Sequence, residues 1–173
     1  MKNSFLNFVV FILVLLLVQG CGKKNQVDPK QIVMKFQQAY NNRDTAAIAQ
    51  LYSEDATYIV SGEAEPIHGR AAIEQNQITF FRAFPDLTVE FTNIFTSKDQ
   101  FCVEWLTKGT HTGPLATPEG DIPPTGRTVE FKGAFFANLT PEGLIAEDRT
   151  YYDTVSFMNQ LGLNEQPEET LDK

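Results

Sequence analysis

The spacing of the apolar residues changes once along this chain, and that change constrains the fold more than any other feature. From Asp28 to Phe84 most apolar residues recur at the spacing of amphipathic helices. From Leu87 onward they alternate, as in strands that bury one face. Helices followed by four long antiparallel strands predict an α+β domain.

Cap residues mark where the predicted helices begin. Asp28 precedes Pro29, a pairing typical of an N-cap followed by the first helical position. Asp44 stands in the same kind of position before a short second helix, whose apolar stripe extends to Tyr52. The predicted helices are therefore 29–40, 45–52 and 70–84.

Five strands are predicted from the alternating pattern, at 56–60, 87–95, 101–105, 129–139 and 144–152. The last two carry apolar residues on both faces, so we expect both faces of the sheet to be covered. Helices would cover one face, and a second copy of the chain would cover the other. The pattern therefore predicts a homodimer.

The first twenty residues have the pattern of a targeting segment. A basic start at Lys2 is followed by an unbroken apolar run of eleven residues, 8–18. This run is well short of the ~20 residues that a membrane-spanning helix needs. The segment Val18–Cys21 resembles a bacterial lipobox. That resemblance implies cleavage before Cys21, which would become a diacylated and N-acylated first residue.

Acyl chains on Cys21 would attach the protein to a membrane of a bacterial cell envelope. Gly22 is not the aspartate that retains enterobacterial lipoproteins in the inner membrane, so we expect the outer membrane. Ordinary secretion with an unmodified Cys21 stays open as an alternative. Residues 21–28 would form a tether, 29–163 the folded domain, and 164–173 an acidic, disordered tail.

Charge and cysteine content exclude several functions. The formal net charge of −8 argues against binding nucleic acid or anionic lipid through charge. Cys102 is the only cysteine besides Cys21, so we expect no intrachain disulfide in the acylated protein. His68, His111 and Cys102 are too far apart along the chain to predict a metal site. We expect no metal and no cofactor.

Four segments resemble the SnoaL-like polyketide cyclases, or ester cyclases, of the nuclear transport factor 2-like superfamily. They are FPDL, EWLTKGTHTG, PPTGR and LIAEDRTYYD…QLG, and the resemblance covers roughly residues 28 to 163. It implies a cone, in which a curved antiparallel sheet wraps around three helices and leaves a pocket at the open end. It also implies dimers through the outer face of the sheet, and cofactor-free ring closure by an intramolecular aldol condensation.

The family's acid/base aspartate has no counterpart at its own position. In the resembled family it lies three residues before a second aspartate, which matches Asp153 here and would cap the last helix. The matching position is Thr150, whose hydroxyl cannot act as a base at neutral pH. In a strand, Asp148, Thr150 and Tyr152 share one face, so Asp148 is the candidate base and Tyr152 a candidate hydrogen-bond donor to a ligand. In the alternative interpretation Asp148 is structural and accepts hydrogen bonds from a neighbouring strand.

His111 is the second candidate catalytic residue. It matches the histidine of a Gly-x-His-x-Gly segment in the resembled family, and an imidazole could move protons near neutral pH. A loop histidine that bonds to backbone is the alternative. Trp105 and Thr150 are expected to line the pocket with Tyr152, and His68 is expected to be structural.

Two functions remain open on these observations. In the first, an exported, lipid-anchored domain binds a small, mostly apolar molecule and acts as a cofactor-free cyclase, isomerase or lyase through Asp148 or His111. In the second, the same domain binds its ligand without catalysis, as a module of the envelope. Thr150 favours the second function, because it removes the family's acid/base group.

Overall fold

A computed structural model describes residues 27–117 and 120–163 of the chain. Cys21, the apolar run before it and the tail 164–173 lie outside the described residues. The helices are α2 (Pro29–Asn41), α3 (Thr45–Ala49), α4 (Arg70–Ala83) and α5 (Thr154–Gln160). The strands are β1 (Tyr52–Val60), β2 (Ile67–His68), β3 (Thr88–Thr96), β4 (Gln100–Thr110), β5 (Thr128–Leu139) and β6 (Ile145–Tyr152). None of the described helices is long and apolar enough to cross a membrane.

Aspartate caps begin α2, α3 and α5. The carboxylate of Asp28 accepts from the Lys30 N–H at 3.0 Å, that of Asp44 from Ala47 at 2.9 Å, and that of Asp153 from Ser156 at 2.9 Å. Each cap satisfies an N–H group that has no partner inside its own helix. All three predicted caps are confirmed.

The second helix is shorter than the apolar stripe predicted. It ends at Ala49, and Tyr52 is the first residue of β1 rather than the last apolar position of a helix. Tyr52 is fully buried, and its backbone pairs with Ile145 of β6. The sheet therefore overrides the local helical pattern, because strand pairing satisfies the backbone of this buried residue.

The sheet has the strand order β2-β1-β6-β5-β4-β3. Neighbouring strands are antiparallel except β1 and β6, which pair in parallel, with Tyr58 opposite Asp148 and Val60 opposite Thr150. The predicted α+β fold with a curved sheet is confirmed, but the expectation of a wholly antiparallel sheet is wrong for this one pair. Helix α4 and four other strands separate β1 from β6 in the chain, and so long a crossover permits the parallel direction.

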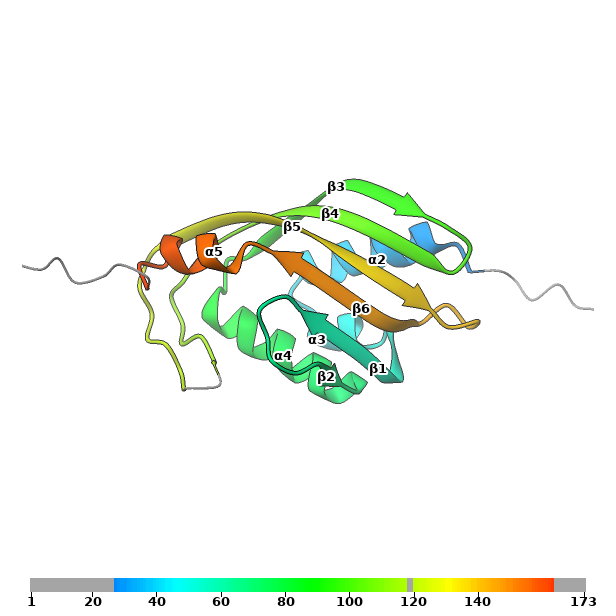
Figure 1. The fold of residues 1–173 in the computed structure, drawn as a ribbon, viewed down its shortest axis with the longest axis horizontal. Coiled ribbons are helices and arrows are strands. Elements are labelled where there is room, and N and C mark those ends of the chain that lie inside the picture. Colours follow the sequence, from blue (N-terminus) through cyan, green and yellow to red (C-terminus); the bar gives the residue numbers. More distant parts are fainter. Residues whose placement is uncertain (1–26, 118–119, 164–173) are drawn as a thin grey trace, which may run out of the picture.

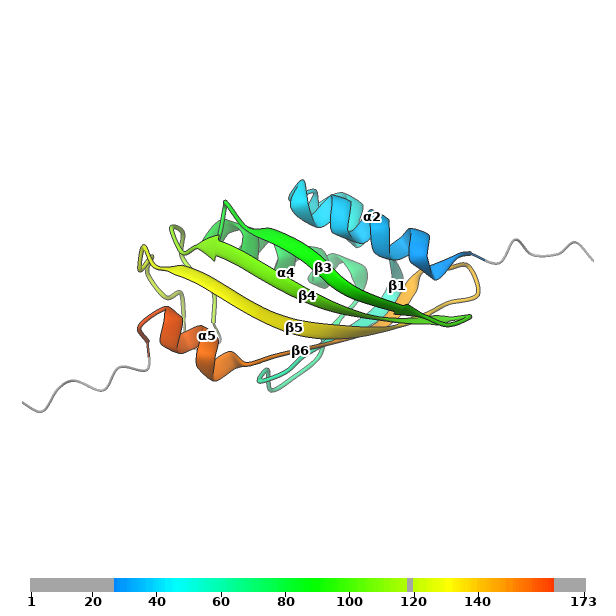
Figure 2. The same ribbon diagram turned by 90° about the horizontal axis from the view of Figure 1, so that it is seen from above.

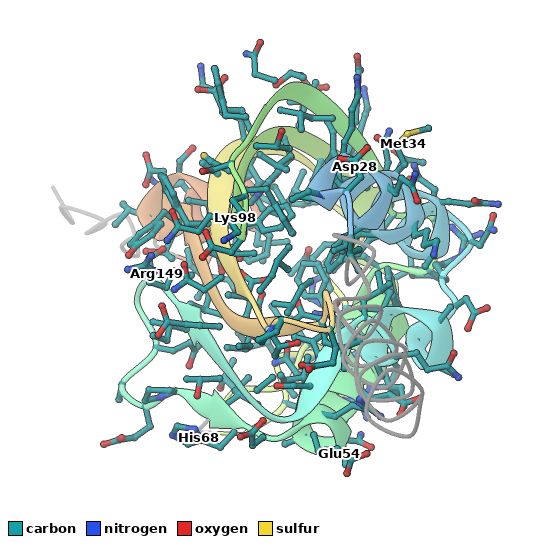
Figure 3. The ribbon with its side chains drawn as sticks, turned by 90° about the vertical axis from the view of Figure 1, so that its right-hand side faces the viewer. Asp28, Met34, Glu54, His68, Lys98 and Arg149 are labelled. Carbon is teal, nitrogen blue, oxygen red and sulfur yellow. The ribbon has the colours of Figure 1, made fainter. Side chains whose placement is uncertain are left out.

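Helices and sheet enclose one aromatic core. Helices α2 and α4 lie along the same face of the sheet, and α5 lies beside the start of β5 (Figures 1 and 2). Phe36 of α2 meets Phe135 of β5 with ring centroids 5.4 Å apart, and Phe157 of α5 meets Phe131 at 4.9 Å. Viewed from the end, the sheet curves around an interior filled with side chains (Figure 3). One end of this interior remains hollow.

A glycine in the middle of β5 makes room for the only tryptophan of the chain. Gly133 lies opposite Trp105 of β4. A Cβ at Gly133 would come within 2.5 Å of the Trp105 ring and would also meet the Tyr151 carbonyl. Glycine therefore allows the indole to lie flat against the sheet, on the face that lines the hollow.

The outer face of the sheet carries exposed apolar side chains. Phe95, Phe136 and Tyr151 are 62%, 43% and 47% exposed. The register places Phe95 opposite Cys102, and Cys102 opposite Phe136, so these residues form one row across three strands. Arg149 continues the row beside Phe136 and points away from the interior in Figure 3. The described helices lie on the other face and leave this row uncovered.

Candidate functional site

The hollow end of the domain is a cavity of about 540 Å³. Its wall is formed by α2, α4, α5, the inner face of the sheet, and the segments that follow β1 and β4. Eleven of the 28 lining residues are aromatic: Phe36, Tyr40, Tyr52, Tyr58, Phe80, Phe91, Trp105, Phe131, Phe135, Tyr152 and Phe157. A cavity of this size and composition suits a small, mostly apolar molecule.

Asp148 lies in the wall of this cavity and is 2% exposed. Thr150 and Tyr152, which follow it at alternate positions of β6, line the same cavity, and so does Trp105. The Tyr52 hydroxyl donates to Asp148 Oδ2 at 2.7 Å, and the Thr150 hydroxyl donates to Asp148 Oδ1 at 3.1 Å. Each carboxylate oxygen therefore has one neutral donor and keeps one lone pair for a ligand.

Burial controls the charge of Asp148. It raises the pKa of this carboxyl to about 7, while the hydrogen bonds from Tyr52 and Thr150 oppose the rise. Among the described residues that line the cavity there is no lysine, arginine or histidine. A carboxyl with a pKa near neutrality, beside a space that a ligand can enter, can both accept and return a proton.

Four tyrosines line the same cavity as the carboxyl. Burial is the main cause that raises the pKa of Tyr40, Tyr52, Tyr58 and Tyr152 above that of an ordinary phenol. The charge of Asp148 adds to the rise at the first three of these residues. All four phenols therefore stay neutral at physiological pH and can act as hydrogen-bond donors.

His111 is fully buried, but it does not line the cavity. Its Nδ1 accepts from the Thr125 N–H at 3.2 Å, and its backbone bonds to Arg127 and Gly126. These bonds fasten the segment that follows β4 to the segment that precedes β5. Burial lowers the pKa of the imidazole, and the Gly113 backbone opposes part of that change. The structure thus does not bring His111 into the cavity that Asp148 lines.

Tyr52 and Tyr58 are site residues that the sequence pattern did not single out. Both lie on β1 and line the cavity, and the register of β1 against β6 shifts between them. Tyr52 was not predicted as a strand residue, because it also fits the apolar stripe of the preceding helix. Because of this irregularity, the period of a regular strand would not have shown that both tyrosines line the cavity.

The other candidates lie apart from the cavity. Asp153 caps α5. His68 lies on β2, with Nδ1 3.3 Å from the Thr57 hydroxyl, and does not line the cavity. Within residues 27–117 and 120–163, no group of three histidine, cysteine, aspartate or glutamate side chains could hold a metal ion. The site therefore consists of one buried carboxyl, its hydroxyl donors and aromatic walls.

Comparisons with known proteins agree on the fold. The family model described as SnoaL-like polyketide cyclase matches residues 30–161. A comparison with curated proteins gives no match. A putative SnoaL-like polyketide cyclase from Jannaschia sp. CCS1 is similar in structure, with a TM-score of 0.69 at 17% identity, covering 80% of this chain and 93% of that one.

Two Streptomyces proteins show the same likeness. IdmH, a putative polyketide cyclase from Streptomyces antibioticus, has a TM-score of 0.64 at 24% identity, covering 79% of this chain and 99% of that one. AclR, a putative hydroxylase from Streptomyces galilaeus, has a TM-score of 0.66 at 20% identity, covering 83% of this chain and 87% of that one. Proteins that share this fold are thus described with different activities. The chemistry must therefore be argued from the residues of the site and not from the fold.

Proposed function

Because the chain belongs to the SnoaL-like polyketide cyclase family, we propose that it binds a small, mostly apolar molecule in its cavity and moves protons on that molecule through Asp148. The observation that carries this proposal is the placement of Asp148. It is a buried carboxyl with a pKa of about 7, in an aromatic cavity open to a ligand. No cofactor is needed for such a step.

The proposed chemistry begins with ionised Asp148. Its carboxylate removes a proton from a carbon beside a ligand carbonyl, and the electron pair moves to the carbonyl oxygen. A neutral phenol of the cavity wall, such as that of Tyr152, donates a hydrogen bond to the developing oxyanion. The enolate then attacks a second carbonyl of the same molecule, and Asp148 returns its proton to the alkoxide that forms, or the enolate takes the proton back from Asp148 at a different carbon. The first outcome closes a ring, and the second isomerises the ligand.

Binding without turnover is the second candidate function. Thr150 occupies the position that matches the family's acid/base aspartate, and Asp148 lies one strand repeat away from it. A ligand oriented for the family's reaction would then have no base at its reacting carbon. In this case the same cavity would hold a ligand without chemistry.

Exchange of carbon-bound hydrogen for deuterium separates the two functions without knowledge of the natural substrate. An aromatic β-ketoester is incubated with protein in deuterium oxide, and exchange beside its carbonyl is followed by NMR. Binding is followed in parallel through the fluorescence of Trp105, the single tryptophan.

We expect exchange in the wild type, its loss in Asp148→Asn, and its retention in Glu147→Gln. Glu147 is a matched control because it lies next to Asp148 on β6 but pairs with Arg149 at 3.2 Å. Binding without exchange in every variant would support the second function. Exchange that survives Asp148→Asn would refute the role of Asp148.

We also propose that the protein is anchored to the bacterial envelope through acyl chains on Cys21, as the lipobox resemblance of Val18–Cys21 implies. Dimerisation through the outer face of the sheet is part of the same proposal. It is supported by the exposed row that contains Phe95 and Phe136.

A further inference from the structure

The charged groups of the cavity wall are all acidic. Asp148 lies in the wall, and Glu63, on the segment that follows β1, is exposed and lines the cavity too. No lysine, arginine or histidine is found among the described lining residues. The charge of Glu63 acts on groups of the cavity wall, because it contributes to the raised pKa of Tyr152. A ligand that enters therefore meets negative charge and no compensating positive charge.

Asp148 lacks a counter-ion in the described structure. Its two partners, Tyr52 and Thr150, are neutral hydroxyls. Ionising a carboxyl in so apolar a place is costly unless a positive charge approaches it. An ammonium group on a ligand would supply that charge through a charge-assisted hydrogen bond.

Aromatic rings add a second attraction for a cation. The faces of tyrosine, tryptophan and phenylalanine rings are electron-rich and attract ammonium groups that lie within about 6 Å of the ring centre. Tyr40, Tyr58, Trp105 and Tyr152 line the same cavity as Asp148. The wall thus combines a carboxylate with several rings, which is a chemistry suited to organic amines.

We infer that the natural ligand of this cavity carries a protonated amine on an otherwise apolar body, and that carboxylates and phosphates are rejected. This inference rests on the proposed binding function and names the ligand class of the same site. The ammonium would lie against Asp148 and hold it in the ionised form. The apolar body would lie between the aromatic walls.

This pairing predicts a proton released on binding. The titratable groups that face Asp148 are Tyr40 of α2 and Tyr52 and Tyr58 of β1. They, and Tyr152 farther along β6, remain neutral phenols. Asp148 is therefore the group that changes charge near neutrality. When an amine binds below about pH 7, Asp148 gives up its proton to solvent.

The test uses three probes that share one apolar body: naphthylmethylamine, naphthylmethanol and naphthoate. Affinities are measured by isothermal titration calorimetry on the wild-type protein at about pH 8, in two buffers of different ionisation enthalpy, and again at about pH 6. We expect the amine to bind at least about tenfold more tightly than the alcohol, and the naphthoate to bind most weakly. The buffer dependence at the lower pH should show release of a proton when the amine binds.

Variants locate the effect at Asp148. In Asp148→Asn the preference for the amine over the alcohol should fall to within about threefold, whereas Glu147→Gln should keep it. If Asp148→Asn does not fold, the proton release of the wild type still tests the pairing. Equal affinity for alcohol and amine would overturn the inference and leave the proposed binding function standing.

Two further outcomes would also overturn the inference. A preference for amine that persists in Asp148→Asn, or a wild type that binds the amine without releasing a proton, would remove Asp148 from its role. Failure of all three probes, together with failure of a neutral apolar dye to change Trp105 fluorescence, would refute the proposed function as well.

Discussion

The Tyr52 hydroxyl donates a hydrogen bond of 2.7 Å to Oδ2 of Asp148, a residue 96 positions later in the chain. Both side chains are buried, at 0% and 2% exposure. The bond crosses from β1 to β6, the one parallel pair of the sheet. It fixes the orientation of the carboxyl and stabilises its ionised form, so that burial raises the pKa only to about 7.

The pH dependence of stability should report the buried carboxyl. Folding raises the pKa of Asp148 from 3.8 to about 7, so between these values the folded protein binds a proton that the unfolded chain has lost. Asp148 therefore contributes to the free energy of unfolding at low pH. This contribution, at most roughly 4 kcal/mol, is lost as pH rises through about 7.

The amide of the Asp148→Asn variant does not titrate. The free energy of unfolding of this variant, relative to that of the wild type, should therefore increase with pH. Urea unfolding of both proteins at about pH 5 and about pH 8 measures the difference. A difference that is the same at both pH values would show that the pKa of Asp148 is not raised.

Tyr52→Phe should remove the donor and little else. Without its hydrogen bond the ionised carboxylate is less stable, so the pKa of Asp148 should rise above about 7. The free energy of unfolding should fall by about 1–2 kcal/mol at low pH. Carbon NMR of the aspartate carboxyls measures the pKa. Tyr151→Phe, on the outer face, is the control and should leave it unchanged.

Thr150→Asp should create a pair of carboxyls. The Thr150 hydroxyl is 3.1 Å from Oδ1 of Asp148, so an aspartate there would share a proton with it, and one of the two pKa values would rise strongly. It would also place an acid/base group where the family has one. We expect deuterium exchange to increase at least about tenfold over wild type. Thr150→Asn is the control of similar volume, and equal exchange in both variants would contradict the prediction.

Phe136→Glu should separate the proposed dimer. Phe136 lies in the exposed row of the outer face, where a charge would be buried against the second copy. Light scattering on residues 25–173 at tens of micromolar, about the range in which weak dimers form, should show a wild-type dimer and a Phe136→Glu monomer. Val155→Glu, which replaces an exposed residue of α5, should remain dimeric. A monomeric wild type would refute the dimer.

Cys21→Ser should abolish membrane anchoring. Acyl chains can be attached to Cys21 only through its thiol and the amine that cleavage exposes, so the variant should stay uncleaved or be mislocalised. Mass spectrometry of the mature N-terminus and detergent partitioning check this. Cys102→Ser, which changes the other cysteine, should keep the anchor. A mature wild-type N-terminus other than acylated Cys21 would contradict the prediction.

Features that depend on near neighbours in the chain followed from the sequence. The caps at Asp28, Asp44 and Asp153 act within three residues of the N–H groups that they satisfy. The alternation of β6 sets which side chains share a face, so the sequence by itself groups Asp148 with Thr150 and Tyr152. The resemblance of four segments to one family supplied the cone fold, which the family match and the structural likenesses show.

The environment of Asp148 was decided only by the tertiary structure. An alternating strand predicts a buried face, but it does not specify which other strand pairs with it or in which direction. The parallel pairing of β1 with β6 brings Tyr52 and Tyr58 to Asp148, and the bonds of the Thr125 region hold His111 away from the cavity. These contacts join residues far apart in sequence, and their strength depends on burial, which the local pattern of a strand does not specify.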